Sequence, residues 1–405
     1  MSVSNKLLDE SGSEYGTGAS IEDVVSSKNN RLRNNAVAGK SMGRLVALDA
    51  ARGLAVIGMY LQHFGQNERI GAIVAGNTTL LFVLCGGISY SIMAQRLKDR
   101  ETEMTSFRAR MLARAVFIDV IGYLLIMLNT GYGVILPSYA AMFVLALVLV
   151  HRSTRVLVMT AAALTVIAPP LMILGMSLLS EAYLLSDIAG GPMSALALAP
   201  AFVAGMAIGR LDLTRIRTAL SLTVGGIVMF VGGKVLDAFV LPGLRPSFEA
   251  WLERVQGVVP MGYQPDLYAI WPLNTEPPLW HMLLSAAPHT ASTFQTLIGL
   301  GLALLVLGLV CLVPKITSSV LLVPFAAVGR VALTMYAAQF IVIWSLKHAG
   351  IENGLEGIPL RDLLVVAVTL VTGWLIAWLP NGPLESLMRH FDRVFSASRT
   401  IPASR

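Results

Sequence analysis

The chain has 405 residues, of which 55% are hydrophobic and only 13% are charged. This balance excludes a soluble globular protein and indicates a polytopic membrane protein whose charges are confined to loops and ends. The net charge of +6 arises from Lys and Arg beside hydrophobic segments, which favours cytoplasmic loops and anionic lipid contact over nucleic-acid binding. The two cysteines, Cys85 and Cys311, fall inside apolar runs and are expected to be small packing residues.

The first 43 residues are rich in Ser, Asn, Gly and charge and contain no apolar run. Because such a composition cannot form a core, we expect residues 1–43 to be a disordered tail. The tail lacks the apolar centre of a signal peptide, so the first hydrophobic segment is expected to stay in the membrane. Arg31, Arg33, Lys40 and Arg44 precede that segment and place the tail in the cytoplasm by the positive-inside rule.

Ten hydrophobic segments follow, and they predict an all-α, polytopic integral membrane bundle of about ten transmembrane helices within residues 44–380. The predicted spans lie at about 45–63, 71–94, 113–129, 134–151, 156–178, 193–210, 219–241, 291–313, 331–346 and 361–379. Residues 321–330 are too interrupted to assign, and they fit either an interfacial segment or the start of the ninth span.

Basic residues recur at every second connection, so the positive-inside rule predicts that both termini are cytoplasmic and that residues 381–405 form a basic cytoplasmic tail. The connection from 242 to 289 then lies outside the membrane, and a loop of that length is usually functional or a lid. Its tryptophans, among them Trp251 and Trp280, fit an interfacial belt and also fit stacking on a sugar.

The first span is unusual because it carries Asp49, Arg52 and His63 in an otherwise apolar helix. At ~100° and ~1.5 Å per residue, Arg52 and His63 lie within roughly 20° on the helix surface and about 16 Å apart along it. Asp49 lies one turn before Arg52 and can neutralise it, whereas His63 stands alone. Ionisable groups inside a membrane usually mark functional sites, although Asp49 and Arg52 also fit a simple interfacial anchor.

The predicted topology sorts the other polar residues by side. Arg96, Arg114 and Arg330 lie with Asp49 and Arg52 near the cytoplasmic face, where guanidinium groups could hold the phosphates of an acyl-coenzyme A or could serve only as positive-inside anchors. His289 lies with His63 at the outer face. A neutral imidazole there can take a proton from an acceptor or carry an acyl group, and it can also be a hydrogen-bonded structural residue.

Neither a metal site nor a phosphate-binding loop is predicted. The histidines lack close spacing to Cys or carboxylates, and no Walker-type sequence is present. Glycine pairs inside the spans, such as Gly86-Gly87 and Gly225-Gly226, are better explained by close helix packing than by ligand binding.

Several segments together resemble membrane acyltransferases. Leu48-Asp49-Ala-Ala-Arg52-Gly53 followed by His63 resembles an opening helix with an L-D-x-x-R-G signature and an Arg-x10-His pair. Leu81 to Ser89 resembles the F-x-x-x-x-G segment of the second span of these enzymes. The later segments Pro288 to Phe294, Val328 to Gln339 and Gly382 to Glu385 are similar to bacterial multi-span proteins grouped with the heparan-α-glucosaminide N-acetyltransferase family, which is related to acyltransferase family 3.

The resemblance implies transfer of an acetyl or other short acyl group from cytoplasmic acyl-CoA to an acceptor outside, with Arg52 and His63 as the essential pair. The lysosomal enzyme carries its catalytic histidine in a loop after the first span, whose counterpart here, Gly65 to Ile70, has no histidine. Whether His63 carries the acyl group, acts as a base, or leaves this work to His289 therefore stays open.

The sequence thus predicts an acyl-CoA-dependent acyltransferase of the bacterial plasma membrane that modifies a cell-envelope glycan or glycolipid, contacts membrane lipids and fits a homo-oligomer. The predicted catalytic residues are His63, Arg52, Asp49 and His289; the predicted donor-binding residues are Arg96, Arg114 and Arg330; no metal is expected. One alternative is a transporter or flippase of an envelope lipid that uses Asp49, Arg52 and His63 as a proton relay. A second is a structural subunit that tolerates substitution of Arg52 and His63.

Overall fold

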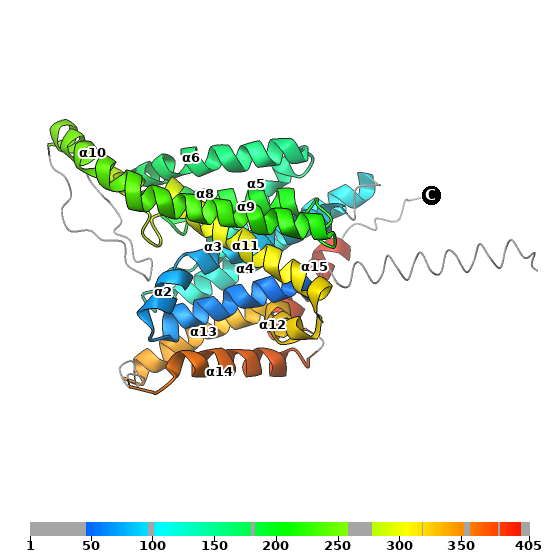
Figure 1. The fold of residues 1–405 in the computed structure, drawn as a ribbon. Coiled ribbons are helices and arrows are strands. Elements are labelled where there is room, and N and C mark those ends of the chain that lie inside the picture. Colours follow the sequence, from blue (N-terminus) through cyan, green and yellow to red (C-terminus); the bar gives the residue numbers. More distant parts are fainter. Residues whose placement is uncertain are drawn as a thin grey trace, which may run out of the picture. The chain divides into compact units, whose positions relative to one another are not determined.

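The computed structural model describes residues 46–95, 101–179, 183–257, 278–317, 319–351, 357–379 and 381–397 (Figure 1). All regular structure in these ranges is helical. The predicted tail at 1–43 and the candidate Arg96 lie outside them. Within the described ranges, four helices are long and apolar enough to cross a membrane, and a bent pair makes a fifth. The predicted helical membrane bundle is confirmed.

Each of the ten predicted spans coincides with helical structure in the described part of the chain. The elements are the opening helix (46–64), α2 (Glu68–Val74), α3 (Asn77–Gln95), α4 (Glu101–Ile126), α5 (Leu136–Leu149), α6 (Thr154–Leu178), α7 (Tyr183–Ala189), α8 (Ala195–Ile208), α9 (Ile216–Val235), η1 (Leu236–Val240), α10 (Leu241–Gln256), η2 (Trp280–Leu284), α11 (Thr293–Ile316), η3 (Ser319–Leu322), α12 (Val323–Arg330), α13 (Ala332–His348), α14 (Arg361–Ile376) and α15 (Pro383–Ala397).

Serine residues set the starts of several helices. The hydroxyls of Ser153, Ser194 and Ser292 accept hydrogen bonds from backbone N–H groups in the first turns of α6, α8 and α11. A side-chain oxygen at this position satisfies a donor that the helix leaves unpaired. The boundaries of these three helices are therefore fixed by local chemistry.

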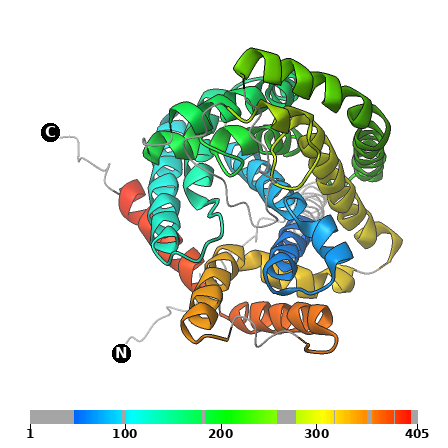
Figure 2. The ribbon, with the colours of Figure 1, turned by 90° about the vertical axis from the view of Figure 1, so that its left-hand side faces the viewer.

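The opening helix and α3 form the centre of the bundle. Figure 2 looks along the helices and shows these blue segments with the later helices around them. The buried residues of α3 include Leu80, Leu84, Cys85 and Ile88 and occupy nearly all of its circumference. A helix that is apolar on every face can be satisfied only inside a bundle or a membrane.

Glycines let α3 and α8 approach closely. A methyl group built on Gly87 would collide with the carbonyl oxygen of Phe202, and one built on Gly205 would collide with that of Leu84. Small residues allow helices in a membrane to pack backbone to backbone, where dispersion contacts replace the hydrophobic effect. The structure thus supports the packing interpretation of Gly86-Gly87, since Gly86 lies directly beneath Tyr139.

The structure corrects the expected loop at 242–289. Residues Leu241–Gln256 form α10, which continues α9 through the π-helical turn η1, so helix runs from Ile216 to Gln256. Pro242 lies where η1 passes into α10 and Pro246 lies inside α10, so this continuous helix contains both prolines. Proline and polar residues therefore suggested a loop although the local geometry permits a helix. Residues 258–277 of the expected loop lie outside the described part.

The unassigned segment 321–330 is a separate short helix. Helix α12 meets α13 at a bend of 65°, so the two form either one broken span or a re-entrant segment. The bend follows Gly329, over which the opening helix passes: a methyl group there would collide with the carbonyl oxygen of Asp49. The crossing places the end of α12 beside the start of the opening helix.

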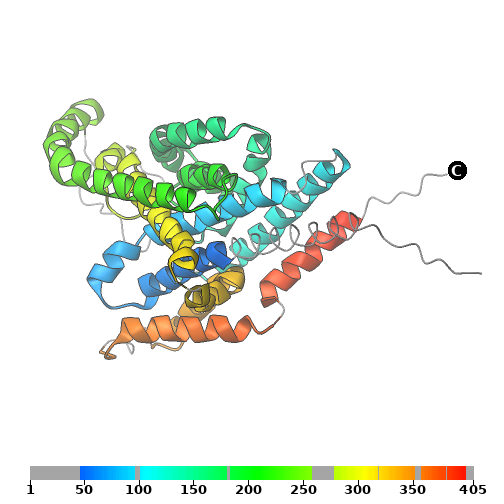
Figure 3. The ribbon, with the colours of Figure 1, turned by 45° about the vertical axis from the view of Figure 1, so that its right-hand side comes forward.

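The expected basic tail at 381–405 is a packed helix in its first part. Figure 3 shows α15, in red, turning away from the orange α14. The Glu385 carboxylate accepts hydrogen bonds from the backbone N–H groups of Leu333 and Thr334, at 2.8 and 3.1 Å, and from the Thr334 hydroxyl. Asp392 pairs with Arg114 at 2.7 Å. A carboxylate at the start of α13 is stabilised by the unpaired N–H groups there.

Candidate functional site

The polar side chains of the opening helix belong to two separate groups. Asp49 and Arg52 lie near its start, and His63 lies near its end, about 16 Å further along the helix. The buried residues between them, such as Ala55, Val56 and Met59, are apolar. We call the first group, with Ser89 and Gly329, the arginine cluster. The second is the histidine cavity, which His63 and His289 both line.

Protein acceptors surround the guanidinium group of Arg52. It donates to the Asp49 carboxylate at 3.0 Å, to the carbonyl oxygen of Gly329 at 3.3 Å and to the hydroxyl of Ser89 at 2.7 Å. Its side chain is 21% exposed. Arg52 therefore joins three segments that are distant in sequence: the opening helix, α3 and the end of α12. This is a structural role beyond that of an interfacial anchor.

Glycine makes this junction possible. Gly53 lies against the carbonyl oxygen of Phe325, so a side chain at residue 53 would push α12 away from Arg52. The Arg-Gly pair in the opening helix thus combines a long donor with a position where another backbone can approach.

The three predicted donor-binding arginines do not form one group in the described residues. Arg114 is occupied by its ion pair with Asp392. Arg330 is exposed at the end of α12, and its positive charge acts on the Asp49 carboxylate. Arg96 lies outside the described ranges. Of these candidates, Arg330 has the exposure that a phosphate ligand would need.

The histidine cavity brings together residues from six parts of the chain. It has a volume of about 30 Å³, enough for one or two water molecules. His63 comes from the opening helix, His289 from the segment before α11, and Tyr336 and Gln339 from α13. The positional expectation that His63 and His289 lie at the same depth agrees with this geometry, while their roles remain predictions.

Aromatic rings fix the orientation of His63. Its ring meets that of Tyr132 edge-on, with centroids 4.6 Å apart and an interplanar angle of 79°. The centroid of the Phe340 ring lies 6.4 Å from that of His63. Two residues that line the cavity are also bonded to each other, because the Tyr336 hydroxyl accepts a hydrogen bond from the backbone N–H of Ile135 at 3.0 Å. The imidazole is therefore held in place by packing.

The backbone at His289 adopts a conformation that L-residues rarely take. Its φ is 58°, and that of Ala291 is 48°. Non-glycine residues in this region cost of order 1 kcal/mol and often occur at functional sites. The His289 Nε2 atom lies 3.0 Å from Gln62 Nε2, so one of the ring nitrogens faces the residue next to His63. Gly76, at φ 71°, lies against the His289 backbone.

Two buried atoms of the cavity residues have no hydrogen-bond partner in the protein. They are Nδ1 of His63 and Oε1 of Gln339, and Gln339 is only 1% exposed. Buried polar atoms in this state are rare and costly, so each calls for an explanation. His281 Nδ1 is also unpartnered, which means that this property alone does not define a site. The site is defined instead by two such atoms, His63 Nδ1 and Gln339 Oε1, whose residues line one cavity.

Sequence reasoning did not assign roles to Ser89, Gln62, Gln339 or Glu385. Three of them, Ser89, Gln339 and Glu385, end the very segments that carry the acyltransferase resemblance, and Gln62 precedes His63. The sequence could have pointed to these residues because each is a polar residue in or beside a helical segment. It could not identify the partner of each side chain, because that partner lies on a different helix.

The described residues contain no group of three or more His, Cys, Asp or Glu side chains that could hold a metal ion. Cys85 and Cys311 are both buried thiols, as expected for packing residues.

Comparisons with known proteins find a similarity for only part of this chain. No curated protein matches it, and no solved structure matches it. Residues 251–393, about a third of the chain, match the model of a family described as "Protein of unknown function (DUF418)". The matched region contains His289, Gln339 and Glu385, whereas His63 and Arg52 precede it. The C-terminal third is therefore similar to the DUF418 family.

Proposed function

We propose that this chain is a membrane acyltransferase whose chemistry takes place at the histidine cavity. The donor is acetyl-CoA or another short acyl-CoA, and the acceptor is an amine or hydroxyl of an extracytoplasmic cell-envelope glycan or glycolipid. The protein resides in a bacterial plasma membrane with both termini in the cytoplasm. The observation that carries the proposal is the pair of unpartnered atoms, His63 Nδ1 and Gln339 Oε1, beside a second histidine.

The two orphan atoms suit an acceptor that carries a proton. Gln339 Oε1 can accept a hydrogen bond from an N–H or O–H group, and an unprotonated His63 Nδ1 can take the proton as that group attacks. The acceptor then forms a bond to the acyl carbonyl carbon, the thioester bond breaks and the coenzyme leaves as the thiol after protonation. A cavity of about 30 Å³ has room for one or two water molecules, so it must widen to hold the reacting group of the acceptor together with the acyl group.

The arginine cluster supports this reaction indirectly. Arg52 is surrounded by three protein acceptors, so its clearest contribution is to hold the opening helix against α3 and α12. Exposed Arg330 is the better candidate for phosphate contact. The apolar residues between the two groups make a proton relay from Asp49 to His63 a weaker basis for function than local chemistry at the cavity.

A turnover assay tests the proposal. Purified protein in detergent is mixed with acetyl-CoA that carries labelled acetyl and with envelope glycan extract, and both thiol release and labelled product are measured. We expect His63→Ala to abolish both and His348→Ala to leave both unchanged. His348 is a matched control because it lies at the exposed end of α13 and contacts Trp344. Absence of thiol release and label transfer by the wild-type protein with every short acyl-CoA would refute the proposal.

Orientation needs its own test. Gln66 lies in the turn after His63 and Arg155 near the start of α6, and both are exposed. A cysteine at residue 66 should react with an impermeant thiol reagent in intact cells, and a cysteine at residue 155 should react only after permeabilisation. The buried Cys85 and Cys311 give a low background. The reverse pattern would place the acceptor site in the cytoplasm.

A further inference from the structure

Two further pockets lie away from the histidine cavity, along a groove that α8 shares with α5 and α6. The first is polar, has a volume of about 600 Å³ and is lined by Gln95, His151, Thr154, Met206 and Arg210. It lies where the turn between α5 and α6 meets the ends of α3 and α8. The predicted topology puts this turn on the cytoplasmic side of the membrane.

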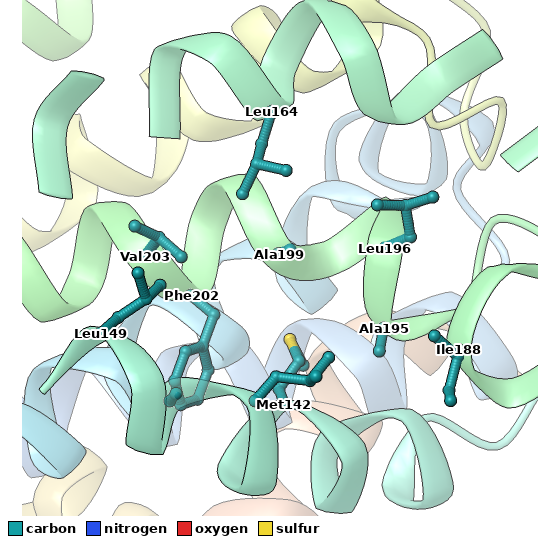
Figure 4. A pocket seen from close by; sticks show the side chains of 11 residues that line it. Met142, Leu149, Leu164, Ile188, Ala195, Leu196, Ala199, Phe202 and Val203 are labelled. Atoms are coloured by element: carbon teal, nitrogen blue, oxygen red, sulfur yellow. The ribbon is translucent and has the colours of Figure 1, made fainter. Parts of the chain in front are cut away.

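The second pocket of the groove is apolar. It has a volume of about 170 Å³, and Figure 4 shows Leu164 of α6 facing Ala199 and Val203 of α8 across it, with Met142 of α5 on the opposite wall. Every lining side chain is aliphatic, aromatic or methionine. Such a space in hydrocarbon surroundings is suited to an alkyl chain.

The residues that line the two pockets are neighbours in the sequence. Leu149 lines the apolar pocket and Val150 the polar one, while Val203 lines the apolar pocket and Met206, one turn later, the polar one. Along α8 the apolar stretch from Ala195 to Val203 extends over about 12 Å. One leaflet of the hydrocarbon core is about 15 Å thick. A polar space near the membrane surface thus continues into an apolar space of about leaflet depth.

Arg210 gives the polar pocket a positive charge. Its guanidinium donates to two backbone carbonyl oxygens, those of Val150 at 3.0 Å and Arg152. Neither is a carboxylate, and the nearby Asp212 pairs with Arg215. The guanidinium carries five N–H donors, so it can serve these carbonyls and a phosphate at once.

The apolar pocket opens sideways. Leu145 and Ile188 line it and are 52% and 40% exposed, and the adjacent Val148 is 70% exposed. In a membrane-spanning bundle these surfaces face lipid, so an occupant can enter from the bilayer without crossing water.

We propose that this groove binds an anionic phospholipid of the surrounding membrane, with its phosphate at Arg210 and one acyl chain in the apolar pocket. The lateral opening, the charge of Arg210 and the leaflet-scale depth together select a bilayer lipid as the occupant. The site is independent of the histidine cavity, and it does not depend on the acyltransferase proposal.

Photocrosslinking in nanodiscs tests the site. The discs contain phosphatidylcholine with a minor fraction of phosphatidylglycerol that carries a photoreactive group in its acyl chain, and crosslinked peptides are identified by mass spectrometry. We expect labels concentrated on α5 and α8 peptides that line the apolar pocket. We expect Ala199→Phe, which fills the pocket, to remove this labelling, and Arg210→Gln to reduce it about fivefold through loss of one cationic contact.

Two matched variants control for general effects. Ala162→Phe adds the same ring to an exposed face of α6, and Arg215→Gln removes an exposed charge, so neither should change the labelling. Equal labelling in Ala199→Phe and the wild type would overturn the proposal, as would labels spread evenly over lipid-exposed helices. Displacement by palmitoyl-CoA, but not by excess unlabelled phosphatidylglycerol, would instead identify the occupant as an acyl donor and would also overturn it.

Discussion

The two ends of the opening helix hold polar side chains in opposite states. At one end Arg52 has three protein acceptors, and at the other His63 Nδ1 has no partner although it is buried. Buried networks whose members are fully satisfied tend to stabilise a structure, whereas unsatisfied buried atoms persist when function retains them. The difference supports the proposal that the arginine cluster holds the bundle together and that the histidine cavity is the place of the chemistry.

The largest expected effect concerns activity at the cavity. His63→Ala should lower the turnover of acyl-CoA by about 10²- to 10⁴-fold, because the proton acceptor is lost. Its melting temperature in detergent should fall only by the cost of the lost contacts with Tyr132 and Phe340, because no hydrogen bond at Nδ1 is broken. Near-normal turnover would assign His63 to packing alone.

At the arginine cluster the largest effect should be on stability. Arg52→Lys keeps the charge but loses the planar fork that reaches Asp49, Gly329 and Ser89 together. We expect a loss of about 1–3 kcal/mol in the free energy of unfolding, the cost of leaving buried acceptors unpaired. Thermal unfolding in detergent measures it. Arg330→Lys is the matched control at an exposed position. If Arg52→Lys unfolds like the wild type but is inactive, the cluster belongs to the catalytic machinery.

A loss of similar size is expected where the opening helix crosses α12. Gly329→Ala introduces a methyl group against the Asp49 carbonyl oxygen and should destabilise the protein by about 1–3 kcal/mol through overpacking. Gly232→Ala on α9 meets open space, so the same substitution there should be neutral or stabilising. Equal melting temperatures for the two variants would contradict the close crossing.

The smallest effect is expected at α15. Glu385→Gln replaces a carboxylate with a neutral amide at the start of α13 and should cost about 1 kcal/mol, the difference between charged and neutral hydrogen bonds. Glu253→Gln, at an exposed position on α10, should change nothing. An unchanged melting temperature in Glu385→Gln would show that α15 contributes little to the bundle.

The sequence predicted the fold better than the site. Hydrophobic runs alone located helical structure at each predicted span, and four of these helices, or five with the bent pair, are long and apolar enough to cross a membrane. It failed at Pro242, a residue typical of loops that lies inside a continuous helix, and at Glu385, a residue of the expected tail that caps a distant helix. Those contacts depend on neighbours that hydropathy does not describe.

At the candidate site, too, the sequence predicted contacts within one helix and missed contacts between helices. Asp49 and Arg52 were predicted as a pair because they are three residues apart on one helix, and His63 was notable as a titratable ring in an apolar span. Ser89, Gln62 and Gln339 escaped assignment because their importance lies in which helix faces them. Only the folded chain brings Gln339 within the cavity of a histidine that precedes it by more than 250 residues.

The central claim is that acyl transfer takes place at the histidine cavity, which His63 and His289 both line, and a double-mutant cycle on turnover tests it most directly. His63→Ala, His289→Ala and the double variant are compared in the same acyl-CoA assay. Residues that serve one chemical step are strongly non-additive, so the account predicts that the double variant is about as slow as the slower single variant. Effects that multiply, as two independent sites would give, would contradict it.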